Sequence, residues 1–489
     1  AFLLGATDQT SRTFMPITPT NRQTQLFLFV QDSWVVSRRL TLELGLRYEL
    51  YTTVKPRYAG GASNYDPETN SLLVAGVGDV GLSTNVDLDP NNFAPRLGIA
   101  YRVDDKSVLR AGYGVSYYTG RFGFTGGTLS TQFPTIYNVQ EGVANDFRID
   151  GSFDTLPVVN LIDVPANGRI SPAPNQGFFV IPKKNPIPYV HSFNLMYQRE
   201  FAGGVSLEVG YVGSLGRQLP LNQSLNAALP GTGREGLPFN IRFGRTADVS
   251  LRAPGVNNNY NSLQVNAGKR FSRGVSFTAA YTYGRALDVG SDQAGFTINV
   301  DRRRNYGPAN FDRTHMFVAS HTWELPFGAG QRYLNSGPAS YLVGGWQVNG
   351  IFRAVTGAPV NIVADSGPCN CPGNGNYADV VGPVRYLDGT GLGDLWFDPA
   401  SFRAPAANTF GNAGRNLVRG PGFVNYDFSL FKNFSFKDRY RVEFRTEFYN
   451  LTNTPRWNNP QGNVNSGQFG QITSAAGERE IQFALRFLF

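Results

Sequence analysis

Side chains that could perform catalysis or bind a metal are few and scattered in this sequence. Of the three histidines, His315 and His321 fall on the same side of a predicted strand. Six residues of strand separate them by roughly 20 Å, which is too far for both to bind one metal. His191 stands alone, and neither G-x-S-x-G nor H-E-x-x-H occurs. The sequence therefore predicts no enzyme, no metal site and no cofactor.

Two glycine-rich stretches, 76–81 and 231–236, match the nucleotide-binding pattern G-x-G-x-x-G. That pattern binds phosphate groups where it opens a helix after a strand. Neither stretch is followed by a helical pattern, so we interpret both as loop glycines.

The only two cysteines, Cys369 and Cys371, lie in a segment rich in Pro, Gly and Asn. Two sulfurs alone cannot close the tetrahedral site that zinc requires. A local disulfide in an oxidising compartment and a pair of free thiols both stay open.

One group of charged side chains alternates with apolar residues near the end of the chain. In a wet lumen, such residues pair across neighbouring strands with about 0.2–1 kcal/mol each. We favour a ladder on a lumen wall that also docks a plug domain, and a substrate-conducting surface is the alternative. The group consists of Arg441, Glu443, Arg445, Glu447, Glu480 and Arg486.

A second group of charges is the run Arg302, Arg303 and Arg304. It could bind an anionic ligand at an outer loop. We favour the alternative, in which the run anchors its loop to a neighbouring strand.

The elements that position these residues are strands in which apolar and polar side chains alternate. In 479–489, apolar residues at every second position, from Ile481 to Phe489, face away from the polar or small residues between them. A soluble sheet edge with such a face would aggregate, whereas a strand between lipid and a wet lumen requires it. About ten alternating residues also suffice to cross a hydrocarbon core.

Twelve similar segments precede this one, and short turns alternate strictly with long loops. The predicted strands are 24–36, 40–50, 93–102, 107–118, 189–200, 205–214, 259–270, 275–286, 311–325, 341–356, 424–432, 440–451 and 479–489. Brief periplasmic turns and large outer loops are typical of outer-membrane barrels. Interfacial aromatics agree with this polarity. Tyr48, Tyr117, Tyr211 and Tyr283 are expected near the outer ends, and Trp34, Trp323 and Trp346 beside the short turns.

The sequence therefore predicts an all-β, transmembrane antiparallel barrel. An antiparallel barrel closes with an even number of strands, so we expect additional strands before Ala1 in the native protein. The absence of an initiator Met and of a signal peptide agrees with a fragment. We assign 1–489 to the C-terminal portion of the barrel, without its plug and N-terminal domains.

Composition excludes two other classes of protein. Only 16% of the 489 residues are charged, and no run of about 18 apolar residues is present, which excludes transmembrane helices. The net charge of +8 does not indicate nucleic acid as a partner, because Lys and Arg are scattered rather than gathered in a stripe.

The segments resemble the barrel of TonB-dependent transporters, specifically the Oar-like branch. The resemblance covers nearly all of 24–489. It rests on the ordered segments 28–34 (LFVQDSW), 44–49 (LGLRYE), 311–315 (FDRTH), 345–350 (GWQVNG), 447–453 (EFYNLTN) and the terminal aromatic strand.

This resemblance implies a barrel of about 22 strands, about nine of them outside this chain. It also implies an upstream plug that contacts the TonB complex, and often an N-terminal carboxypeptidase-regulatory-like domain. Such a monomer lies in the cell outer membrane, among lipid and lipopolysaccharide. Its outer loops capture a bulky ligand for energised transport, and the barrel-assembly machinery reads an aromatic signal at Phe489 and Phe487.

Two other functions stay open at this point. A passive porin-like channel or a surface adhesin would use the same barrel without a plug. A soluble carbohydrate-binding β-sandwich would instead show two stacked sheets.

Overall fold

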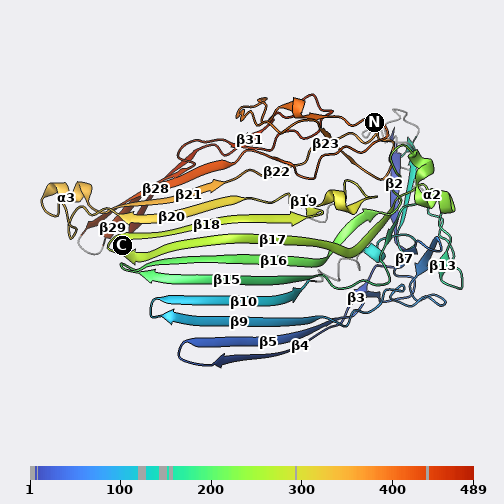
Figure 1. Cartoon of the computed structure of the whole chain (residues 1–489), viewed down its shortest axis with the longest axis horizontal. Helices are drawn as coiled ribbons and strands as arrows, with labels where there is room; N and C mark the ends of the chain where they lie inside the picture. The colour runs from blue at the N-terminus through green and yellow to red at the C-terminus, as the bar shows by residue number, and fades with distance from the viewer. Residues whose placement is uncertain are drawn as a thin grey trace.

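The computed structural model describes residues 6–7, 9–118, 128–142, 151–152, 158–291, 295–436 and 440–489. Thirteen long strands lie side by side in chain order and pair antiparallel in one sheet (Figure 1), to which the short strands β14 (Phe178–Val180) and β19 (Gly307–Pro308) also pair. The long strands are β4 (Gln25–Val35), β5 (Leu40–Tyr51), β9 (Phe93–Asp104), β10 (Ser107–Tyr117), β15 (Tyr189–Phe201), β16 (Val205–Ser224), β17 (Val249–Ser272), β18 (Val275–Asp288), β20 (His315–Glu324), β21 (Trp346–Val355), β28 (Phe423–Phe436), β29 (Tyr440–Tyr449) and β32 (Glu480–Leu488). The predicted number and order of strands are therefore confirmed. No helix among the described residues is long and apolar enough to cross a membrane.

The sheet has an apolar face and a polar face, because residues paired across neighbouring strands lie on the same side. One row of paired residues runs through Leu44, Leu97, Tyr113 and Phe193. The row beside it runs through Gly45, Arg96, Gly114 and Ser192. We call the side of the first row the apolar face and the side of the second row the polar face. Leu44 and Leu97 are 43% and 48% exposed, so the apolar face is left uncovered by this chain.

The predicted interfacial aromatics all lie on the apolar face. Register places Trp34 opposite Leu42, Trp323 opposite Val348, and Tyr283 opposite Leu263. The tryptophans are close to the short turns, where an amphipathic ring would meet both lipid and water.

Short and long connections leave opposite ends of the strands, as predicted (Figure 1). The short end carries turns such as 36–39 and 202–204, together with the connection 325–345. The long connections at the other end are 52–92, 118–188, 225–248, 289–314, 356–422 and 450–479. We call the described residues of these six connections the loop platform.

Several strands are longer than the sequence predicts, and β16 and β17 exceed their predicted ranges most. β16 continues from Ser214 to Ser224, and β17 begins at Val249 instead of Asn259. Their pairing passes an irregularity after Gly216 and continues to Ser224 opposite Ser250. The apolar alternation ends there, but main-chain groups still require hydrogen-bond partners, and each strand supplies them to the other.

Two other strands begin later than predicted. β20 begins at His315 rather than Phe311, because the carboxylate of Asp312 accepts a hydrogen bond from the main-chain N–H of Ala286 and holds a turn there. β21 begins at Trp346 rather than Tyr341, because Pro338–Val343 forms the helix α3 with a proline at its first position.

The buried apolar core lies in the loop platform, not in the sheet. One cluster contains Tyr65, Phe178 and Phe239 from three different connections. Several residues of this cluster lie on a small sheet formed by β7 (Ser63–Asp66), β8 (Ser71–Val74) and β13 (Arg169–Ile170). A second cluster gathers Phe397 and Phe402 within 356–422. The long connections are therefore packed against one another.

Two buried arginines join the connections of the platform. Arg245 has no exposed surface and donates to the main-chain oxygens of Gln176 and Pro172 and to Asn70 Oδ1. It also lies 5.2 Å from the ring centre of Tyr65. A buried guanidinium requires such a complete set of partners.

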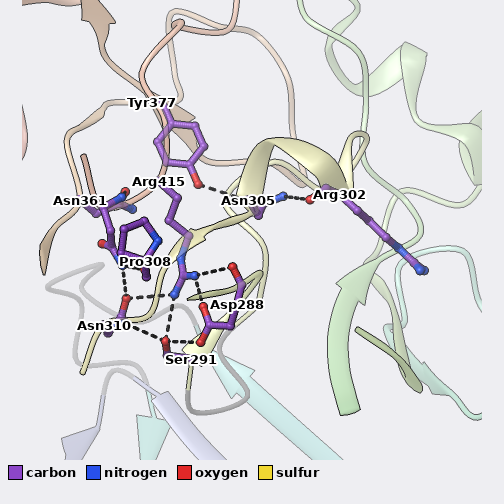
Figure 2. A network of polar contacts seen from close by, with 10 residues as sticks. Asp288, Ser291, Arg302, Asn305, Pro308, Asn310, Asn361, Tyr377 and Arg415 are labelled. Atoms are coloured by element: carbon purple, nitrogen blue, oxygen red, sulfur yellow. Dashed lines mark hydrogen bonds and ion pairs between the residues drawn. The ribbon is translucent and has the colours of Figure 1, made fainter. Parts of the chain in front are cut away.

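Arg415 joins two other connections of the platform, 289–314 and 356–422 (Figure 2). Its Nη1 forms an ion pair with the carboxylate of Asp288 at the end of β18. Its Nη2 donates to Ser291 Oγ at 3.0 Å and to Asn310 Oδ1 at 3.1 Å. Both side chains of the ion pair are nearly buried, with 7% and 10% exposed.

Replacing Arg415 by Ala is expected to lower the local unfolding free energy of 289–314 and 356–422 by about 3–5 kcal/mol, because Asp288 would keep a buried charge without its cation. Hydrogen–deuterium exchange of these two connections measures the change. Arg403→Ala is the control, since its guanidinium is 70% exposed and pairs with Asp379 at 3.6 Å. We expect the control substitution to change the local unfolding free energy by less than about 1 kcal/mol. Equal protection in the two variants would contradict this role for Arg415.

Candidate functional site

The polar face of the sheet is the first part of the candidate site. All six residues of the predicted charged ladder lie on it, because they occupy one parity of β29 and the same face of β32. Glu443 forms an ion pair with Arg445 and lies opposite Arg486 in the register. Glu447 lies opposite Gln482, and Glu480 opposite Tyr449. The structure therefore brings the ladder together, and its role in conduction or plug docking stays a prediction.

A hollow of about 570 Å³ lies on the polar face and is lined by residues of β17 to β29. Its polar lining residues include Ser276, Thr278, Ser320, Thr322, Asn349, Asp427, Ser429 and Glu447. Sequence reasoning missed Asp427, whose Oδ1 accepts hydrogen bonds from Asn425 Nδ2 and the Asn450 main chain, both at 2.9 Å. The signal was present in the alternation of Asn425, Asp427 and Ser429 with aromatic and aliphatic residues.

The loop platform places Arg302, Arg303 and Arg304 differently. Arg302 is exposed, points away from the Arg415 network (Figure 2), and donates to Gln223 Oε1 at 2.8 Å. Arg303 is also exposed. Arg304 donates to the main-chain oxygen of Gly411. Contacts of Arg302 and Arg304 thus bind the loop to other segments, and a ligand role for the run stays a prediction.

A second cavity, of about 160 Å³, lies at the platform end of the sheet. It is lined by the end of β5 from Tyr51, by 220–222 of β16 and by 252–254 of β17. Three strands separate β5 from β16 in the sheet. Residues 86–89 and 185–188 bridge this distance, so the cavity lies where two long connections meet the strand ends.

Three charged residues line this cavity, Arg252, Asp87 and Asp89, and Arg252 is half-buried. Its Nη1 donates to Thr128 Oγ1 at 2.6 Å, and its guanidinium lies 3.9 Å from the ring centre of Phe179. Among the described residues, Arg252 Nε and Asn185 Oδ1 are buried without a hydrogen-bond partner, and both belong to cavity-lining residues. Neither atom faces the open space of the cavity, because each has almost no exposed surface.

The three histidines have a different use. Each lies on the apolar face, and each makes a hydrogen bond to a tyrosine hydroxyl: His191 to Tyr113, His315 to Tyr281 and His321 to Tyr426. These bonds, of 2.8–2.9 Å, satisfy a polar ring in an apolar environment. No group of three potential metal ligands is present in the part of the chain that the structure describes.

Gly350 makes room for the third of these pairs. A Cβ atom added at Gly350 would lie 2.5 Å from both His321 Nε2 and the Tyr426 hydroxyl. This close approach gives a physical reason for glycine at the end of the segment 345–350.

The cysteines and one glycine motif meet in the platform. Cys369 and Cys371 form a disulfide, which the sequence left open. The main-chain N–H groups of Gly231 and Gly233 donate to the oxygens of Cys369 and Asn370, both at 3.0 Å. The expectation that no helix follows this motif was wrong, because α2 (Pro238–Phe243) begins directly after it. The two amides are nevertheless occupied by the disulfide loop, and the glycines are loop glycines as predicted.

Phe487 and Phe489, the predicted assembly signal, belong to the last segment of the chain. Phe487 lies on the apolar face opposite Val442, and the rings of Phe487 and Phe489 stack with centres 5.9 Å apart. Phe489 is 86% exposed. The structure thus leaves both rings accessible.

Comparison with solved structures finds similar chains among outer-membrane receptors. The ferripyoverdine receptor of Pseudomonas aeruginosa bound to ferripyoverdine has 10% identity and a TM-score of 0.44, and the match covers 96% of this chain and 39% of that one. The siderophore receptor PiuA from Acinetobacter baumannii has 9% identity and a TM-score of 0.44, covering 96% and 43%. The copper transporter OprC has 10% identity and a TM-score of 0.44, covering 96% and 48%. This chain spans less than half the length of each.

The comparison with curated proteins finds no match. The model of the family "Outer membrane beta barrel domain" matches residues 1–482. This match covers almost the whole chain, and the antiparallel sheet with one apolar and one polar face agrees with it. The chain therefore belongs to the outer membrane β-barrel domain family, and its place is the outer membrane.

Proposed function

We propose that this chain is the C-terminal part of a TonB-dependent receptor barrel, which transports a bulky ligand and does not catalyse a reaction. One observation carries the proposal. All long connections leave the same ends of the strands and pack into a platform with its own buried core, while a polar face runs down the sheet beneath it. The motifs that resemble the Oar-like branch support the same function.

The ordered platform suits ligand capture. Connections of this length are costly to order, and unless they have a function they are usually disordered. Here buried clusters and the Arg245 and Arg415 networks hold them in place. Such a preorganised surface can bind a ligand without the entropy cost of ordering its own backbone during binding.

We propose that the ligand first contacts the cavity around Arg252 and then the polar face. The Arg252 guanidinium offers a positive charge to the ligand there, and the Asn185 side chain lines the same cavity. Below the cavity, the ligand would meet the Ser and Thr side chains of the hollow and the charged ladder. These groups can form hydrogen bonds with the ligand, and water can take its place when the ligand moves on. The Arg302 and Arg303 side chains are candidate contacts at the platform surface.

We also propose that β4 and β32 pair with strands outside this chain to close the barrel. Among the described residues, the sheet ends at these two strands. β4 is exposed along its whole length, and Phe29, on the polar face, is 79% exposed. In a membrane, main-chain groups at such an edge require partners. A plug linked to the TonB complex would then occupy the lumen.

The first prediction concerns conduction. In planar lipid bilayers, the full-length protein is expected to give no steady ion conductance, because the plug fills the lumen. A variant without the plug segment is expected to give stable conductance steps. Steady conductance by the full-length protein would instead indicate a passive porin-like channel. No conductance by either protein would indicate an adhesin.

The second prediction concerns the lipid face. Leu195→Arg places a charge on the apolar face in the middle of β15 and is expected to lower the unfolding free energy in vesicles by about 2–4 kcal/mol. Asn194→Arg is the control, since its neighbours in the register, Gly112 and Val212, lie on the polar face. We expect it to cost less than about 1 kcal/mol. Urea titration of the full-length protein measures both, and equal losses would contradict the assignment of the faces.

The third prediction concerns assembly. Phe489→Ser is expected to reduce the amount of folded protein in the outer membrane several-fold, because the assembly machinery would lose the aromatic signal that the resemblance implies. Leu488→Ser is the matched control, because Leu488 lies opposite Arg441 on the polar face. Quantification of heat-modifiable protein in outer-membrane fractions measures both variants. Equal amounts in the two fractions would contradict a special role for Phe489.

A further inference from the structure

The connection 325–345 differs from the other connections at the short end of the sheet. It carries one charged residue, Arg332, over its whole length. Its apolar side chains are nevertheless uncovered: Tyr341 and Leu342 of α3 are each 74% exposed, and Leu334 is 56% exposed. An apolar and exposed segment with a single charge requires a partner surface.

Lys432 fixes α3 at the apolar face of the sheet. Register places Lys432 opposite Trp346 and Phe444 on that face. Its Nζ donates to the main-chain oxygens of Tyr341 at 2.7 Å and Leu342 at 3.3 Å, and also to that of Gly344. The ammonium group thus occupies the free carbonyls at the C-terminal end of α3. Since only 2% of Lys432 is exposed, these bonds replace its hydration.

Trp346 continues the contact between α3 and the sheet. Its Nε1 donates to the oxygen of Leu342 at 2.9 Å, and Lys432 Nζ lies 5.4 Å from its ring centre. An apolar crevice of about 300 Å³ opens beside it, lined by Leu325, Phe327, Leu342, Val343, Trp346 and Leu430. The exposed surface of α3 is therefore continuous with the lipid face of β21 and β28.

We propose that α3 is an interfacial anchor, which inserts Tyr341 and Leu342 between the lipids of the leaflet at the short-turn end. Three observations favour lipid over a protein partner. The surface continues the lipid face, it is flanked by Trp346 and Tyr333, and it lacks the charges that a water-exposed turn normally carries. Tyr and Trp are enriched at this depth of a bilayer, and a short apolar helix face can lie about 5–10 Å inside the interface. α3 extends past the strand ends on that side (Figure 1).

The loop platform supplies a matched control. α2 has the same length as α3, six residues, and also begins with a proline. Its Ile241 is 72% exposed, nearly the same fraction as Leu342. α2, however, belongs to the platform and bonds through Arg242 to Glu68. The two helices therefore present similar side chains in different surroundings.

The variants Leu342→Cys and Ile241→Cys of the full-length protein, each labelled with bimane in vesicles, test the proposal. Both native cysteines of this chain are in the disulfide, and unmutated protein gives the background label. With dibromostearoyl phosphatidylcholine, the label at 342 is expected to lose at least about half of its fluorescence, while aqueous iodide has little effect. The label at 241 should show the reverse. Heat-modifiable migration on gels shows that each variant is folded.

Quenching of the label at 342 by iodide, to the extent seen at 241, would overturn the proposal. Protection of the 342 label from both quenchers would also overturn it, because it would indicate that protein covers α3. Either result would leave the proposed transport function untouched, since that function depends on the platform and on the polar face.

Discussion

The constraint on which the structure depends is that hydrocarbon offers no hydrogen-bond partner to the main chain. A segment that enters the membrane must therefore pair its N–H and C=O groups with another segment, and the antiparallel sheet does this over thirteen strands. Pairing also puts residues at alternate positions on opposite sides. One side can then be apolar while the other remains hydrated, so a single geometric rule separates the apolar face from the polar face.

Because of this constraint, the hydrophobic core lies among the loops and not against the sheet. Because lipid covers the apolar face, the sheet does not require a packed protein interior of its own. The buried clusters lie instead among the long connections, where Phe178 and Phe397 are almost fully covered. Buried arginines complete that packing. The loop platform is thus held by the same forces as a soluble domain, while the part in the membrane is held mainly by main-chain pairing and lipid.

Polar residues on the lipid face follow the same constraint. The histidines are bonded to tyrosine hydroxyls, and Lys432 is bonded to the end of α3. Neither arrangement resembles a catalytic or metal-binding group. Each removes an unsatisfied polar group from an apolar environment, which would otherwise cost about 1–3 kcal/mol.

The number of strands, their order, the two faces and the ends with short and long connections could all be predicted from the amino-acid sequence. These properties follow from the two-residue period of a strand and from the length of each connection, and both can be recognised within a short stretch of sequence. The extension of β16 and β17, the helix α3, the cavity at Arg252 and the buried contacts of Arg245 and Arg415 became apparent only in the folded chain. Each of these features depends on groups that are far apart in the chain, such as Asp288 and Arg415. The residues around a charged side chain in the sequence do not indicate which distant group will pair with it when it is buried.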